Sequence, residues 1–211
     1  MNVLLLEQGT PEWFAARLGK PTGSVYAEVL AKGKSGAASV TRGNLVVKLA
    51  LELVTGQPAA PAFKKTQAML DGTEREPLAR ALYEGLRSVM VDEVGFCQHD
   101  TIFTGVSPDG LIDADGMLEI KCPTEAVHRS YMLRTDEPPE YRAQIQGQLW
   151  VTERAWCDFV SFNPAFPTNA QLIVRRVLRD EAYITQLEAE VIKLNQEVAA
   201  EAEAIRNYKE S

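Results

Sequence analysis

Residues 103–122 of this chain read FTGVSPDGLIDADGMLEIKC, and this stretch decides the fold. Two apolar segments, Leu111-Ile112 and Met117 to Lys121, flank a turn at residues 113–116 that contains two Asp and ends in Gly. Apolar runs separated by such a turn are typical of paired antiparallel strands. We therefore expect a β-hairpin in the middle of the chain.

Three charged residues come together on this hairpin. Glu119 and Lys121 are two residues apart on the second strand, so both side chains project from one face. The hairpin folds Asp109, at the start of the first strand, back beside that pair. We expect two carboxylates and an ammonium group at one edge of a sheet, although an ordinary solvated hairpin has the same pattern.

This charge cluster suits a particular chemistry. Two carboxylates this close repel each other, so ionising both requires a compensating cation. Oxygen ligands favour Mg²⁺ or Mn²⁺ over zinc. A divalent ion can bind a phosphate oxygen and lower the pKa of a bound water, while Lys121 orients that water or stabilises charge on phosphorus. Asp109, Glu119 and Lys121 thus predict metal-assisted phosphodiester hydrolysis.

Apolar periodicity and helix caps place the remaining elements around the hairpin. Helices are expected from residue 11 and at residues 25–30, 45–54, 66–88, 124–133, 140–152 and 180–211, and strands at 89–96, 156–162 and 171–178. Leu78, Leu82 and Leu86 are expected to face the core. The last helix is amphipathic and is expected to pack against the rest of the domain. This order predicts an α/β or α+β domain.

Composition excludes several classes of protein. Of the 211 residues, 45% are hydrophobic and 24% are charged, which is ordinary for a soluble globular chain. No run approaches the roughly 18 apolar residues of a membrane span, and the N-terminus lacks the basic segment of a secretory signal. The three cysteines are widely spaced, which disfavours a disulfide framework or structural zinc. We expect a cytoplasmic protein with no membrane partner.

The net charge of −7 is unevenly distributed along the chain. Residues 180–211 hold eight acidic and three basic residues, whereas residues 1–87 hold eleven basic and eight acidic residues. The basic first part is compatible with phosphate binding, whatever the acidic total indicates.

The residues around the three charges resemble the PD-(D/E)xK nuclease core. Over residues 7–164 the chain is similar to the phage lambda exonuclease, or alkaline exonuclease, family of viral-type recombination nucleases. The matching blocks, in chain order, are Trp13 with Arg17-Leu18-Gly19 and Thr22-Gly23-Ser24, then Gly72 to Glu76, then Ser107-Pro108-Asp109-Gly110 with Glu119-Ile120-Lys121-Cys122-Pro123, then Ala143 to Gln146 followed by Trp150-Val151-Thr152.

The resemblance implies a fold and a set of metal-site residues. The fold is α/β, a central mixed β-sheet flanked by helices, as a single nuclease domain over residues 1–211. Asp109 and Glu119 would be metal ligands together with the main-chain carbonyl of Ile120. Lys121 would be the catalytic lysine acting on the attacking water, and Glu76 would reach the same cluster from its helix.

The resemblance also implies a pocket for a terminal 5′ phosphate. Arg17, Ser24 and Ser107 match the positions that hold this phosphate in the family, and a guanidinium fork with hydroxyl donors suits a phosphate monoester. Gln144 would lie at the rim of the active site. The family's basic residue near this pocket has no clear match in the chain, and His128 and Arg129 are the candidates.

The implied activity is that of a Mg²⁺-dependent 5′→3′ exonuclease acting on linear double-stranded DNA, with Mn²⁺ able to replace Mg²⁺. It would leave 3′ single-stranded overhangs for a single-strand-annealing recombination protein, as a homotrimeric ring in the cytoplasm of a bacterial or phage-infected cell. The acidic residues 180–211 would then face away from the DNA. A structure-specific or restriction-type endonuclease and a non-catalytic DNA-binding module remain the alternatives.

Overall fold

The computed structural model describes residues 1–33, 39–58 and 67–209. Its main sheet is mixed and has the order β4 (Gly110–Ile112), β5 (Gly116–Lys121), β6 (Trp156–Phe162) and β7 (Leu172–Leu178). The central pair β5 and β6 is parallel, and both outer pairs are antiparallel. The predicted hairpin is confirmed as β4 and β5, and the predicted mixed sheet is confirmed with it.

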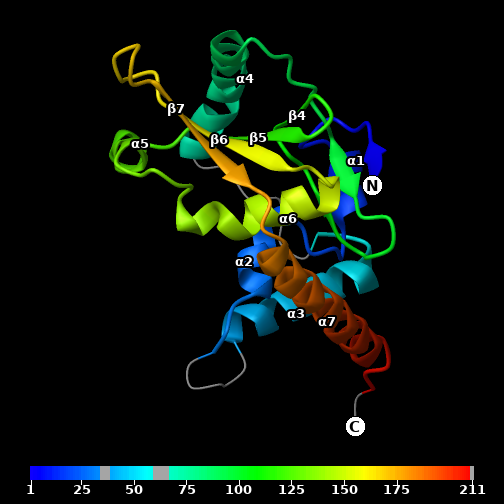
Figure 1. Cartoon of the computed structure of the whole chain (residues 1–211). Coiled ribbons are helices and arrows are strands. Elements are labelled where there is room, and N and C mark those ends of the chain that lie inside the picture. Colours follow the sequence, from blue (N-terminus) through cyan, green and yellow to red (C-terminus); the bar gives the residue numbers. More distant parts are fainter. Residues whose placement is uncertain (34–38, 59–66, 210–211) are drawn as a thin grey trace.

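Helices cover both faces of this sheet, as Figure 1 shows with α4 on one side and α6 on the other. On one face, Ala79 and Tyr83 of α4 (Gln67–Arg87) pack against Leu118 of β5 and its neighbours. On the other face lie α5 (Glu125–Met132) and α6 (Arg142–Thr152), which belong to the crossover from β5 to β6. A parallel strand pair needs such a crossover, so the topology itself brings α6 against the sheet.

A smaller antiparallel sheet packs nearby and consists of β1 (Asn2–Leu4), β2 (Phe96–Gln98) and β3 (Gly105–Val106). The strand predicted over residues 89–96 is wrong in its extent, because only the β-bridge between Asp92 and Leu111 forms before Phe96. This segment therefore contacts β4 through a single bridge rather than a continuous ladder.

Two short helices, α1 and α2, follow the first strand of the chain. Thr10 caps α1 (Pro11–Arg17) by accepting a hydrogen bond from the main-chain amide of Trp13, as its side chain predicts. A 3-10 turn at Gly23–Val25 then leads into α2 (Tyr26–Val29). Trp13 is half-buried, whereas its neighbour Phe14 is 49% exposed.

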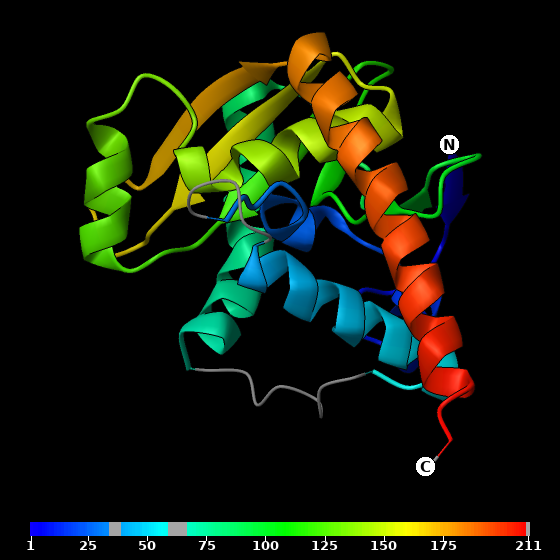
Figure 2. The same cartoon turned by 90° about the horizontal axis from the view of Figure 1, so that it is seen from below.

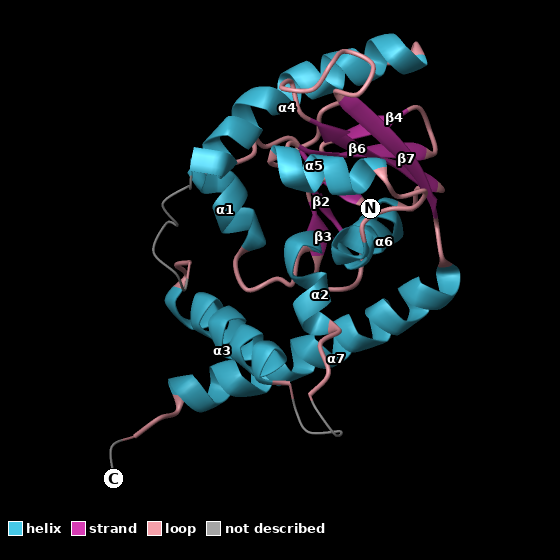
Figure 3. Ribbon diagram, turned by 90° about the vertical axis from the view of Figure 1, so that its left-hand side faces the viewer, coloured by secondary structure: helices cyan, strands magenta, loops and turns pink. Residues whose placement is uncertain are grey.

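The helices α3 (Val40–Thr55) and α7 (Glu181–Arg206) pack together at the end of the molecule away from the main sheet (Figure 3). Figure 2 shows α7 passing across α3. The predicted apolar stripe of α7 is confirmed, because its members are buried: Ile184, Leu187, Val191, Leu194, Val198 and Ala202. Within the described ranges, no helix is both long and apolar enough to cross a membrane.

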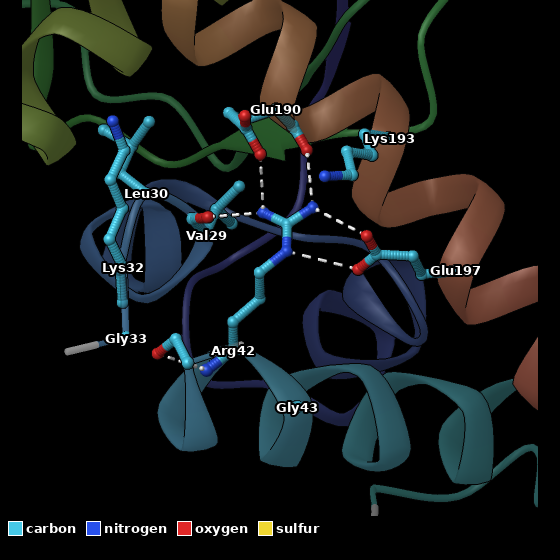
Figure 4. A pocket seen from close by; sticks show the side chains of 11 residues that line it. Val29, Leu30, Lys32, Gly33, Arg42, Gly43, Glu190, Lys193 and Glu197 are labelled. Atoms are coloured by element: carbon cyan, nitrogen blue, oxygen red, sulfur yellow. Dashed lines mark hydrogen bonds and ion pairs between the residues drawn. The ribbon is translucent and has the colours of Figure 1, made fainter. Parts of the chain in front are cut away.

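A polar clamp joins α3 to α7 (Figure 4). Arg42 of α3 donates from Nε to Glu197 at 3.2 Å, and its Nη1 lies 3.1 Å from a carboxylate oxygen of Glu190. The same Nη1 donates to the main-chain carbonyl of Val29. The arginine side chain is only 12% exposed, and Glu190 and Glu197 neutralise its charge in this largely buried position.

The predicted buried face of α4 is wrong. Leu78, Leu82 and Leu86 are 58%, 46% and 61% exposed, whereas Ala79 and Tyr83 are buried. The helix is rotated so that Tyr83 donates to the buried Asp158 of β6 at 2.7 Å. The helix is continuous from Gln67 through Pro77, and residue 66 of the predicted range lies outside the described residues.

Candidate active site

The hairpin brings the three charged side chains together as predicted from the spacing. Asp109 immediately precedes β4, and its main-chain amide donates to the carbonyl of Leu118 on β5 at 3.1 Å. Its carboxylate oxygen Oδ2 accepts a hydrogen bond from the amide of Ile120 at 2.6 Å. Lys121 Nζ donates to Glu119 Oε1 in a short ion pair. Asp109 thus lies beside the strand that carries the other two charges.

Two glutamines of α6 complete the surroundings of Glu119, which is only 1% exposed. Gln144 Nε2 donates to Glu119 Oε1 at 2.6 Å, and Gln148 Nε2 donates to Oε2 at 2.7 Å. The two residues are one helical turn apart and therefore share a face of α6. Gln146 points elsewhere, because its Nε2 donates to the main-chain carbonyl of Leu178.

The electrostatics of the site disfavour two ionised carboxylates beside a single lysine. Burial raises the pKa of Asp109 well above its usual value, and the charge of Glu119 raises it further, while Lys121 opposes the shift. Burial lowers the pKa of Lys121, but Glu119 and Asp109 raise it more, so that the net shift is upward. Lys121 is therefore an ammonium ion at neutral pH, and Asp109 needs a further cation to ionise easily.

The donor set fits a divalent ion of the Mg²⁺ or Mn²⁺ type. Asp109 and Glu119 supply hard carboxylate oxygens, which these ions prefer. The amide of Ile120 points at Asp109, and in an extended strand the carbonyl of the same residue points to the same side. Among the described residues no three His, Cys, Asp or Glu side chains are close enough to hold a metal. The residues that could hold an ion here are Asp109 and Glu119, with the main-chain carbonyl of Ile120 as the resemblance implies.

Glu76 of α4 lies near this group but has its own partner. Its carboxylate accepts a hydrogen bond from Arg80 at 2.7 Å. Burial raises the pKa of Glu76, Arg80 lowers it, and the charge of Glu119 raises it again. The structure therefore places Glu76 within the electrostatic influence of Glu119, and a role at the metal remains a prediction.

A second cluster forms where α1 meets the segment before β4. Arg17 donates from Nη2 to Thr22 Oγ1 at 3.0 Å and from Nη1 to Ser107 Oγ at 3.4 Å. Trp13 Nε1 donates to the same Ser107 oxygen at 3.0 Å. Burial lowers the pKa of Arg17 to about 10, which leaves the guanidinium charged at neutral pH. Ser107 is two residues from Asp109, so this cluster borders the charged group of the hairpin.

Ser24 is exposed and lies in the 3-10 turn that follows Thr22, the residue bonded to Arg17. The preceding Gly23 faces α6, since a Cβ on this glycine would lie 3.7 Å from the side chains of both Gln144 and Gln148. The structure thus brings Arg17 and Ser107 together and places the turn that carries Ser24 against the glutamines.

His128 is not a candidate for the phosphate pocket. It is fully buried, with Nδ1 bonded to Ser161 at 2.8 Å and Nε2 donating to the carbonyl of Ala170 at 2.9 Å. This ring fastens α5 to β6 and to the segment before β7. Arg129 is exposed on α5.

Sequence reasoning missed two side chains of the site. Gln148 has a recognisable signal, because it follows Gln144 by four residues on a predicted helix. Tyr141 has none: its ring lies 5.1 Å from Lys121 Nζ and stacks on Phe159, which only the tertiary fold brings together. Both residues restrict the position of the charged groups of β5.

Comparisons with known proteins identify the family and related structures. Residues 12–155 match the family model described as the YqaJ-like viral recombinase domain. The crystal structure of an alkaline exonuclease, LHK-Exo, from Laribacter hongkongensis is 40% identical, with a TM-score of 0.85, over 93% of this chain and 96% of that chain. The same values hold for LHK-Exo in complex with dAMP.

A more distant structure shows the same fold. A phage-related exonuclease from Haemophilus somnus 129PT is 18% identical, with a TM-score of 0.67, over 89% of this chain and 95% of that chain. No curated protein sequence matched the chain. The expected α/β fold with a central mixed sheet is therefore shared with solved exonuclease structures.

Proposed function

This chain belongs to the YqaJ-like viral recombinase family, and from that membership we propose that it is a Mg²⁺-dependent 5′→3′ exonuclease. Membership in this alkaline exonuclease and viral recombinase group implies a DNA exonuclease role in recombination. The metal, the strand polarity and the form of the product are our own proposals. The convergence of Asp109, Glu119 and Lys121 supports metal-dependent hydrolysis, and the cluster of Arg17 with Ser107 supports action at a 5′-phosphorylated end.

In this proposal Asp109, Glu119 and the carbonyl of Ile120 hold Mg²⁺, or Mn²⁺ in its place. The ion, when bound, would neutralise the carboxylates, polarise a phosphate oxygen and lower the pKa of a water. The charges of Glu119 and Asp109 raise the pKa of Lys121, which would therefore contribute a hydrogen-bond donor and a positive charge to the site. It can orient the attacking water or stabilise the charge that develops on phosphorus.

Glu119 keeps its orientation through hydrogen bonds from both sides. Gln144 holds Oε1 from the rim of the site, and Gln148 holds Oε2. A carboxylate fixed in this way needs little reorganisation when a cation arrives. We assign Glu76 a supporting role as an additional acidic group next to the same cluster.

A terminal 5′ phosphate is the ligand that best suits the cluster around Arg17. Ser107 Oγ accepts from both Trp13 and Arg17, and a hydroxyl has two acceptor positions, so its own proton is free to donate. Arg17 adds a guanidinium charge, and Ser24 is a further hydroxyl on the adjoining turn. The dAMP complex of LHK-Exo, which contains a nucleoside monophosphate, supports a pocket of this chemistry.

The remaining parts of the proposed function concern the substrate and the assembly. The enzyme would degrade one strand of linear double-stranded DNA from a 5′-phosphorylated end, leaving a 3′ overhang for a single-strand-annealing protein. It would act as a homotrimeric ring, with residues 1–211 as a single nuclease domain and α7 away from the DNA. Its place of action would be the cytoplasm of a bacterial or phage-infected cell.

One digestion experiment tests this function. Linear duplexes labelled at either the 5′ or the 3′ end, and a covalently closed circular duplex, are incubated with the protein in Mg²⁺ and then in chelator. We expect early release of the 5′ label, an intact circle and no reaction in chelator. Linearisation of the circle would instead establish an endonuclease, and equal inactivity with and without Mg²⁺ would favour a non-catalytic binding module.

A further inference from the structure

A buried glutamine beside the proposed metal ligands has a polar atom without a partner. Gln148 is 1% exposed, and its Nε2 donates to Glu119 Oε2 at 2.7 Å. Its other amide atom, Oε1, is buried and has no hydrogen-bond partner among the described residues. Buried polar atoms are nearly always paired in folded proteins, so this oxygen requires an explanation.

The neighbouring carboxylate determines how this amide is oriented. An amide oxygen facing a carboxylate would repel it, whereas the amide NH₂ group can donate to it. Gln148 must therefore keep Nε2 on Glu119. Its Oε1 is held on the opposite branch of the same planar amide, where it can only accept hydrogen bonds.

The same carboxylate has one acceptor position left. An ionised carboxylate offers about four such positions, two on each oxygen. Among the donors of the described residues, Lys121 and Gln144 both bond Glu119 Oε1, whereas Gln148 alone bonds Oε2. The remaining position is thus on Oε2, the oxygen that Gln148 holds.

We infer that Gln148 is a positioning residue for the divalent ion of the proposed nuclease site. Its Nε2 fixes Glu119 Oε2 as the oxygen that binds the ion, and its Oε1 accepts a hydrogen bond from a water that the ion retains. Mg²⁺ usually keeps several of its waters, and partners of this kind commonly tune metal affinity. The inference rests on the proposed function, because it presumes an ion at Glu119.

Calorimetric titration of the full chain with Mn²⁺, without DNA, tests this role. Gln148→Leu removes both amide atoms and retains a helix-forming side chain of similar size. We expect it to weaken Mn²⁺ binding by about 10-fold or more. If Gln148→Leu does not fold cooperatively, Gln148→Met provides the same test with a more adaptable side chain.

Gln146→Leu is the matched control on the same helix. Gln146 is also buried, but its amide bonds the carbonyl of Leu178 and the amide of Asp180, away from the carboxylates. We expect this variant to lose thermal stability while retaining wild-type Mn²⁺ affinity. Equal weakening of Mn²⁺ binding in the Gln146 and Gln148 variants would overturn the inference, since general packing of α6 would explain both.

The titration also separates this inference from the proposed function. If the wild-type protein binds Mn²⁺ and the Gln148 variants bind it as tightly, the role of Gln148 is refuted and the metal site stands. If the wild-type protein binds no Mn²⁺, the proposed metal-dependent nuclease itself is refuted, and Gln148 loses its role with it.

Discussion

Arg17 and Ser107 are held by one tryptophan. The guanidinium carbon of Arg17 lies 4.0 Å from the ring centroid of Trp13, and the indole N–H of Trp13 donates to Ser107 at 3.0 Å. The ring face thus stabilises the cation while the ring edge directs the hydroxyl. Two proposed phosphate ligands therefore depend on two separable properties of a single side chain.

Replacing Trp13 with Phe separates these properties. The Trp13→Phe variant keeps an aromatic face for Arg17 but removes the N–H donor to Ser107. We expect the ratio of rates on 5′-phosphorylated and 5′-hydroxyl duplexes to fall by about 2- to 10-fold, the value of one neutral hydrogen bond. An unchanged ratio would show that the indole N–H has no part in recognising the end. Phe14→Leu, next to Trp13 on the exposed side of α1, is the control.

Removing the charge of Arg17 should have a larger effect on the same ratio. We expect Arg17→Ala to slow digestion of 5′-phosphorylated ends by about 10- to 100-fold, as a lost charged hydrogen bond would. Digestion of 5′-hydroxyl ends should change much less, because no phosphate charge is then lost. Rates on the two duplexes, measured with the same enzyme preparation, check this. Equal slowing on both ends would remove Arg17 from the phosphate pocket.

Replacing Lys121 should slow phosphodiester cleavage without weakening metal binding. Lys121→Ala removes a positive charge from Glu119, so the carboxylate should attract a divalent ion at least as strongly as before. We expect single-turnover cleavage to fall by about 100-fold or more, the range observed when one stabilising donor is removed. Mn²⁺ titration should show no weakening. A parallel loss of Mn²⁺ affinity would mean that Lys121 organises the metal site.

Asp109 should destabilise the metal-free protein at neutral pH. Its folded-state pKa is raised by burial and by Glu119, so ionisation above the unfolded pKa of about 4 costs folding stability. In chelator, Asp109→Asn should therefore raise the thermal midpoint at pH 7, and this gain should disappear below about pH 4. Added Mn²⁺ should stabilise the wild type but not the variant. A variant that melts below the wild type at pH 7 would contradict the assigned direction of the shift.

The clamp between α3 and α7 gives a stability prediction away from the site. Arg42→Met leaves Glu190 and Glu197 without their cation, although both carboxylates are more than one-third exposed and can be partly hydrated. We expect a loss of about 2 kcal/mol and a thermal midpoint lower by about 4–8 °C. Metal affinity should not change. A similar midpoint for wild type and variant would show that apolar packing alone holds α7.

The sequence predicted best where a local pattern determines the structure. The spacing of Asp109, Glu119 and Lys121 within a single hairpin was sufficient to bring them together, because strand alternation and a short turn leave few alternatives. The strand Trp156–Phe162 and the stripe of α7 were equally evident from their apolar pattern. The roles assigned to the site residues remain predictions.

The sequence predicted poorly where a tertiary contact decides. The buried face of α4 carries Ala79 and Tyr83, which contact the sheet, and a local pattern with leucines at residues 78, 82 and 86 does not reveal these contacts. Tyr141 reaches Lys121 only because α6 returns across the sheet. Similarly, no local sequence pattern shows that the side chain of His128 is buried and bonded to Ser161 and Ala170 rather than available to a ligand.

The parallel pairing of β5 with β6 also determines when this protein acquires its function during synthesis. The hairpin and the glutamines of α6 leave the ribosome before β6 (Trp156–Phe162). Until β6 is synthesised, β5 lacks the strand with which it pairs in parallel. A nascent or prematurely terminated chain can thus hold every proposed ligand and still lack the framework that assembles them. We expect such fragments to be harmless to the genome of the cell that translates them.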